Sequence, residues 1–259
     1  MEIIRVKNIE YSRYEELLLY REQLRKEAYI YRGLYMKQFG DLLLEIFESQ
    51  IECIKKKKML AYYQMALNRG DTIEQEKVDE FIAREMQEYQ KQLQDMIDEN
   101  KAARKMKEIS SEKFLKIKKI YRRLAKQLHP DINPKTNENK KLLELWNMVV
   151  VAYNCNSLED IEEAEILVNQ AFERIGMGAI EIEITNISEK IEALEEDIQI
   201  IKETEPYQYK YILDNSDLVQ KKTQELEEEK KTYLEYRGEL DKVLAEIIKS
   251  GVRIIWKMN

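Results

Sequence analysis

Apolar residues recur at alternating steps of four and three over long stretches of this chain, and this rhythm restricts the fold more than any other feature. It is the spacing of a helical seam that packs on another helix. Proline and glycine, which interrupt helices, number only three and seven among 259 residues, so few positions favour a helix end. The sequence therefore predicts an elongated all-α protein. The first C-terminal seam comprises Ile180, Ile184, Ile187, Ile191, Leu194, Ile198 and Ile201.

A second seam lies beyond a connector at 206–215 that begins with Pro206. Two long helices joined by a short connector most simply fold back on each other, so residues 175–259 are predicted to form an antiparallel coiled-coil hairpin and a tail. A seam closes equally well between two chains, which leaves a homodimer as an alternative. Residues 179–185 also alternate like a short strand, but the unbroken heptad favours helix. The second seam comprises Leu226, Tyr233, Tyr236, Leu240, Val243 and Ile247.

Residues 1–107 are predicted to form an N-terminal helical region. Apolar spacing indicates helices across 11–67. Gly70 is placed to cap the end of this part, and a long helix from about Glu74 to Lys107 is expected to lead into the next domain. The lysine run at 55–58 is interpreted as a solvated turn of helix.

Residues 108–174 differ from the rest because their charge is segregated. Seven Lys or Arg residues lie between Lys113 and Lys126 without one acid, after a suitable N-cap at Ser110 or Ser111. Pro130 ends this helix, and a polar loop leads to a second helix and then a third over roughly 158–174. Apolar side chains predicted to hold the first two helices together are Tyr121, Leu124, Leu128, Trp146, Val149 and Tyr153; the opposite face of the first helix carries Lys119, Arg122, Arg123 and Lys126.

The only histidine, His129, ends the basic helix and is followed by Pro130 and Asp131. Taken alone, it is interpreted as a helix C-terminal cap. One histidine with two isolated cysteines is poor material for a zinc site. The chain offers neither a nucleophile-elbow glycine pattern nor a glycine-rich phosphate loop. We therefore expect no metal, no cofactor and no enzymatic activity.

The segment "IKKIYRRLAKQLHPDINP" resembles the second helix and loop of the J-domain family of co-chaperones, and "KLLELWNMVVVAYN" resembles the third helix of that domain. The resemblance covers about residues 108–172. It implies that the central domain is a helical hairpin and that His129, Pro130 and Asp131 stimulate ATP hydrolysis by a DnaK-type heat-shock chaperone. It also implies that Lys119, Arg122, Arg123 and Lys126 form the docking face for that chaperone.

The chain also departs from the family pattern. The "YxxLG" turn that commonly precedes the second helix is absent, and neither a Gly/Phe-rich linker nor a cysteine-rich zinc module follows. The resemblance therefore implies a J protein with specialised helical flanks that direct the chaperone to an unknown client. In the alternative hypothesis, the protein is a coiled-coil adaptor whose J-like module does not stimulate an ATPase.

A third hypothesis, nucleic-acid binding through the basic helix and the lysine run, is disfavoured by the net charge of −7. The start of the chain has no apolar segment typical of a signal peptide. Its longest apolar run, at 146–153, is too short to cross a membrane. These features predict a cytoplasmic protein without a membrane partner.

Overall fold

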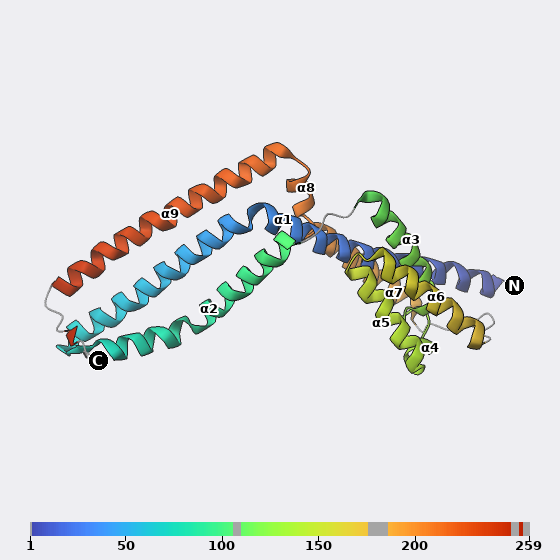
Figure 1. The fold of residues 1–259 in the computed structure, drawn as a ribbon, viewed down its shortest axis with the longest axis horizontal. Helices are drawn as coiled ribbons and strands as arrows, with labels where there is room; N and C mark the ends of the chain where they lie inside the picture. The colour runs from blue at the N-terminus through green and yellow to red at the C-terminus, as the bar shows by residue number, and fades with distance from the viewer. Residues whose placement is uncertain (1, 106–109, 176–185, 250–253, 256–259) are drawn as a thin grey trace. The chain divides into compact units, whose positions relative to one another are not determined.

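The computed structural model describes residues 2–105, 110–175, 186–249 and 254–255, and it has the predicted all-α fold (Figure 1). The chain divides into two compact units. The first unit combines Met1–Ile30 with Lys107–Gln208, and the second combines Tyr31–Met106 with Tyr209–Asn259. One unbroken helix, α1 (Glu2–Arg69), contributes to both. No described helix is long and apolar enough to cross a membrane.

Three central helices of the first unit form where the sequence predicts them: α3 (Ser111–Leu128), α5 (Lys140–Asn154) and α6 (Leu158–Ile175). The predicted polar loop between α3 and α5 contains a short helix, α4 (Lys135–Glu138). Ser110 caps α3 as predicted, because its hydroxyl accepts the Lys113 N–H at 3.3 Å. Side chains likewise cap α5 and α6: Asn139 accepts from Lys141 and Leu142, and Ser157 accepts from Asp160.

Helices α3 and α5 run antiparallel, as two ring contacts show: the residue that lies later along α3 contacts the residue that lies earlier along α5. Tyr121 stacks on Tyr153 with ring centroids 3.7 Å apart, whereas His129 meets Trp146 edge-on at 4.9 Å. The six predicted core residues are all buried (Tyr121, Leu124, Leu128, Trp146, Val149 and Tyr153). Helix α6 packs on both helices and completes the core with Ile161, Ala164 and Val168.

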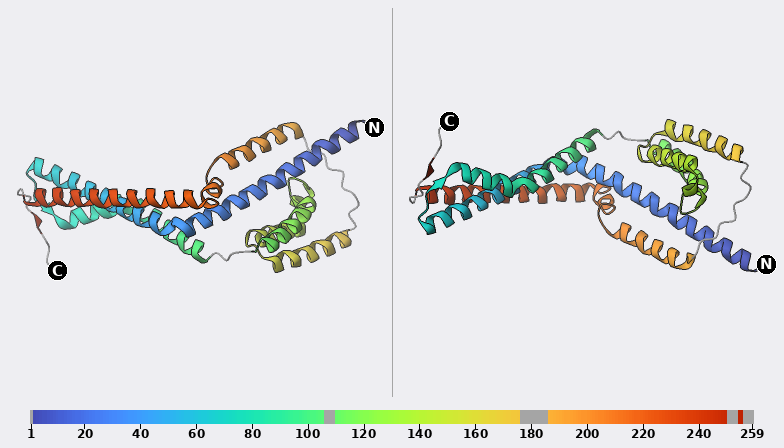
Figure 2. Two further views of the ribbon diagram at one scale, coloured as in Figure 1. Left: turned by 90° about the horizontal axis from the view of Figure 1, so that it is seen from above. Right: turned by 90° about the horizontal axis from the view of Figure 1, so that it is seen from below.

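Two further helices complete the first unit. Residues up to Ile30 of α1 contribute Tyr14, Leu18 and Leu19 to the same core, and α7 (Ile187–Glu203) contributes Ile191 and Leu194. Figure 2 shows this part of α1 lying between α7 on one side and α3–α6 on the other. The first unit is therefore larger than the predicted domain at 108–174.

The second unit is built on the remainder of α1, from Tyr31 onward, with α2 (Gln75–Lys105), α8 (Tyr209–Leu213) and α9 (Ser216–Lys249). Gly70 ends α1 in a left-handed conformation, with φ of 69°, as its predicted capping role requires. Residues Ile73–Glu74 (β1) and Ile254–Ile255 (β2) pair as a two-residue parallel bridge. Earlier along α1, Gly40 allows the Asn100 side chain of α2 to approach closely.

The predicted C-terminal hairpin is wrong. The structure places the seam of α7 in the first unit, where Ile191 and Leu194 join the α1 and α3 core. It places α9 in the second unit, where Leu226 of the predicted seam packs near Tyr35 of α1. Near Ile51 the buried residue is Leu244, and the predicted seam residue Val243 is exposed. A heptad pattern indicates that a helix needs a partner but does not select one. The possible strand at 179–185 lies outside the described residues.

Both cysteines are free thiols. Cys53 is buried in the second unit, where its Sγ lies 3.6 Å from the Tyr233 carbonyl oxygen. Cys155 is exposed directly after α5. The structure therefore offers one accessible thiol and one inaccessible thiol.

Candidate functional site

The His129–Asp131 turn closes the hairpin of α3 and α5. The backbone N–H of His129 donates to the Ala125 carbonyl at 2.8 Å and so completes the last turn of α3. Its own carbonyl accepts the N–H groups of Ile132 and Asn133 at 2.9 and 2.7 Å. Pro130 has no N–H and cannot extend the helix, so the chain turns at this point and leads into α4.

The His129 side chain points inward, and only 9% of the residue is exposed. Its Nδ1 accepts the backbone N–H of Asp131 at 3.1 Å, and its ring packs against Trp146. Burial lowers the pKa of His129 below its ordinary value, and nearby Arg21 lowers it further, whereas Asp131 and Glu22 oppose the shift. The ring is therefore neutral near pH 7, with the Nδ1 lone pair engaged and the proton on Nε2.

Asp131 differs from His129 in being exposed, while Pro130 is half-buried. Asp131 acts electrostatically on Tyr14 of α1: burial raises the pKa of Tyr14, and the negative charge of Asp131 raises it further. The three predicted trigger residues thus lie together in one tight turn. Asp131 is accessible from solvent, whereas His129 supports the turn from inside.

The four predicted docking cations are all exposed on α3, but they divide into two pairs. Arg123 forms an ion pair with Glu165 of α6, and Lys126 forms one with Glu15 of α1 at 2.5 Å. Lys119 and Arg122 make no ion pair with any described residue. They are the members of the predicted face whose charge stays open to a partner.

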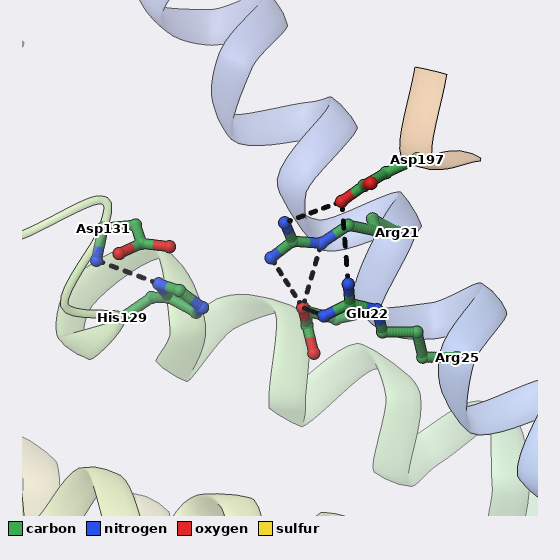
Figure 3. Close-up of polar contacts among 6 residues, drawn as sticks. All are labelled: Arg21, Glu22, Arg25, His129, Asp131 and Asp197. Atoms are coloured by element: carbon green, nitrogen blue, oxygen red, sulfur yellow. Dashed lines mark hydrogen bonds and ion pairs between the residues drawn. The ribbon is translucent and has the colours of Figure 1, made fainter. Parts of the chain in front are cut away.

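Helix α1 makes contacts around this site that no sequence pattern predicts. The Tyr11 hydroxyl donates to the Ile132 carbonyl at 3.2 Å, directly beyond the turn. Figure 3 shows Arg21 and Glu22 of α1 across from the His129 ring. These residues are separated from the turn by more than one hundred positions, and no local pattern connects them.

Lys26 forms the most buried polar link between α1 and the hairpin. The residue is only 6% exposed, and its Nζ donates to the Tyr153 carbonyl near the end of α5. It also lies 3.5 Å from the centroid of the Tyr153 ring. Burial lowers the pKa of Lys26 to about 8. A cation at a helix C-terminus stabilises the unpaired carbonyls there, so Lys26 ties α1 to the end of α5.

The lysine run at 55–58 lies in the second unit, and each member has a partner there. Lys56 pairs with Asp241 of α9, and Lys58 pairs with Glu85 of α2 at 2.9 Å. These contacts neutralise charge that a phosphate backbone would otherwise attract, so the run does not favour the nucleic-acid hypothesis. The other two contacts join Lys55 to Glu52 and Lys57 to the Tyr236 ring.

Comparisons with known proteins identify no relative: no family model, no curated protein and no solved structure matches the chain. Within the described ranges, no group of three or more His, Cys, Asp or Glu side chains is placed to hold a metal ion.

Proposed function

We propose that this protein is a J-domain co-chaperone that stimulates ATP hydrolysis by a DnaK-type chaperone and directs it to a client. One arrangement supports the proposal: α3 carries cations on its exposed side, ends in the His129–Asp131 turn, and packs antiparallel on α5. This arrangement agrees with what the sequence resemblance implies. In this proposal the chain performs no chemistry and needs no cofactor, because the ATP site belongs to the partner.

The open cations of α3 give the proposal its electrostatic basis. Lys119 and Arg122 project from one side of the helix, separated by three positions, and both are exposed. Such a pair attracts an acidic protein surface, and the attraction falls as salt screens the charges. Asp131 lies beyond the end of the same helix and is also exposed, so one partner surface can reach all three side chains.

Single-turnover ATP hydrolysis by a DnaK-type chaperone tests the proposal. The native protein is expected to raise the hydrolysis rate, and Asp131→Asn is expected to remove the increase. This substitution is preferable to His129→Gln, because the Asp131 side chain is exposed whereas that of His129 holds the turn. Circular dichroism of both proteins verifies equal helicity.

A matched pair of charge variants adds specificity to this test. Lys119→Gln with Arg122→Gln should weaken stimulation, while Lys140→Gln with Lys141→Gln, which removes two exposed cations from the start of α5, should not. The proposal is refuted if neither the native protein nor Glu195→Arg/Asp197→Arg, a variant designed to release α1 from the turn, stimulates ATP hydrolysis.

The second candidate function is a coiled-coil adaptor, and α9 supplies the observation that favours it. Four large apolar side chains on this helix are exposed, and two of them, Leu234 and Ile248, fall on one side of it at 100° per residue and would be buried by a further helix. On this hypothesis, Asp131→Asn retains every interaction of the native chain, and sedimentation shows a dimer or a heteromeric complex. The four residues are Leu218, Leu234, Val243 and Ile248.

A further inference from the structure

Three contacts place the first part of α1 directly on the proposed partner-binding surface. Tyr11 donates to the Ile132 carbonyl, and Glu15 pairs with Lys126, one of the predicted docking cations. Tyr14, which is only 5% exposed, packs in the cluster that contains Leu128 and Ile132 on either side of the turn. A partner protein that binds Lys126 and the inner side of the turn must therefore displace α1.

The ring of His129 faces the same helix. In Figure 3, Arg21 and Glu22 of α1 lie across from the ring, and Glu22 pairs with Arg21 at 2.9 Å and with Arg25 at 3.6 Å. Both side chains are near enough to act on the ring electrostatically: Arg21 lowers the pKa of His129 and Glu22 raises it. Asp131 remains outside this contact and is exposed.

Helix α7 holds α1 from its other side. Asp197 lies 3.6 Å from both Arg21 and Arg25, and Glu195 pairs with Arg13. The two acids are partly exposed, with side-chain exposures of 43% for Glu195 and 46% for Asp197, whereas the Arg21 side chain is only 17% exposed. Exposed pairs are individually weak and are screened by salt, so this part of the contact between α7 and α1 responds to charge, whereas Ile191 and Leu194 of α7 add buried apolar packing.

We infer that residues 11–25 of α1 are an intramolecular cover for the His129–Asp131 turn, held closed by the acidic side chains of α7. This inference rests on the proposed function. In the closed state, Lys119, Arg122 and Asp131 are available for a first encounter with the ATPase. Full engagement of Lys126 and His129 then requires that α1 move away from α3.

Charge reversal on α7 tests the cover without altering α1 or the turn. In Glu195→Arg/Asp197→Arg, the attraction for Arg13, Arg21 and Arg25 becomes repulsion. The matched control is Glu192→Arg/Glu196→Arg, which makes the same charge change at two exposed positions of α7 that form no ion pair with a described residue. A second control, Arg13→Glu/Glu195→Arg, exchanges one pair and should behave as the native protein does.

The single histidine gives a readout that does not depend on ATP hydrolysis. Diethyl pyrocarbonate modifies neutral imidazole, and carbethoxyhistidine in this chain arises only from His129. The reversal variant is expected to react on the order of tenfold faster than the native protein, because it loses three ion pairs between α7 and α1 and adds repulsion between the two helices. Both controls should react at about the native rate. Circular dichroism verifies that the helices remain.

The ATPase assay then separates the inference from the function on which it rests. Faster modification together with greater stimulation of a DnaK-type chaperone by the reversal variant supports both. Faster modification with stimulation equal to that of the native protein overturns the cover and leaves the function standing. Faster modification with no stimulation by any variant overturns the proposed function. Unchanged modification overturns the inference, because the α7 acids then do not hold α1 over the turn.

Discussion

Leu18 provides the most direct measure of how firmly α1 is attached to the hairpin. The residue is 1% exposed and belongs to the core cluster of the first unit. Leu18→Ala removes most of this buried side chain, and substitutions of this kind cost about 2–5 kcal/mol. Alanine is at least as good a helix former as leucine, so the cost falls on the packing of α1 and not on its helicity.

Hydrogen–deuterium exchange read by mass spectrometry measures the effect locally. If residues 11–24 leave the hairpin and open their helical hydrogen bonds while the rest of the unit stays folded, a loss of about 2 kcal/mol accelerates exchange in these residues roughly 30-fold. Peptides from α3 and α5 should change far less. Tyr29→Ala is the matched control, because Tyr29 lies on the same helix within the first unit and is 70% exposed.

Two results would refute this reasoning. If exchange accelerates equally in α1, α3 and α5, then α1 leaves the hairpin only when the whole unit unfolds. In that case it is an integral core helix and not a separable cover. If exchange in α1 does not change at all, the Leu18 contact contributes nothing to holding the helix in place.

Three further predictions concern pH and packing. The pKa of His129 is lowered in the folded protein, so the unfolded chain takes up the proton first as the pH falls. The free energy of unfolding should therefore decrease below about pH 6.5. The decrease should be smaller in His129→Gln, and thermal melts across this pH range would show it. The pKa of Lys26 is lowered from 10.5 to about 8. The free energy of unfolding should therefore increase as the pH rises from about 8 to 10.5, relative to that of Lys26→Met, and urea titrations would detect the increase. Gly40→Ala should destabilise the second unit, because the new Cβ would lie 2.5 Å from the Asn100 Oδ1. In Gly238→Ala the new Cβ meets nothing within 4 Å, so this substitution should stabilise the second unit by about 0.5–1 kcal/mol in denaturant melts.

The hairpin of α3 and α5 was predictable because its determinants are local. The spacing of Tyr121, Leu124 and Leu128 defines one helical face, and Ser110 and Pro130 define where the helix begins and ends. Such signals act over a few residues and depend little on the rest of the chain. The exposed position of Lys119, Arg122, Arg123 and Lys126 followed from the same periodicity.

The partners of the long helices were not predictable, because many apolar seams in this chain are interchangeable. Ile191 of α7 and Leu226 of α9 look equivalent in sequence, yet each packs in a different unit. Similarly, the family resemblance implies a docking role for Lys126, but no sequence pattern predicts its ion pair with Glu15. That pairing depends on the tertiary arrangement and leaves no trace in local spacing.

The two cysteines allow the attachment of α1 to be followed in time. Cys155 is exposed and Cys53 is buried, so a maleimide dye added to the folded protein labels one site. That site is two residues beyond Tyr153, whose carbonyl accepts the Lys26 ammonium. An environment-sensitive fluorophore at Cys155 would therefore report separation of Lys26 from α5. Stopped-flow mixing with an ATPase would then show whether α1 leaves before, during or after the partner arrives.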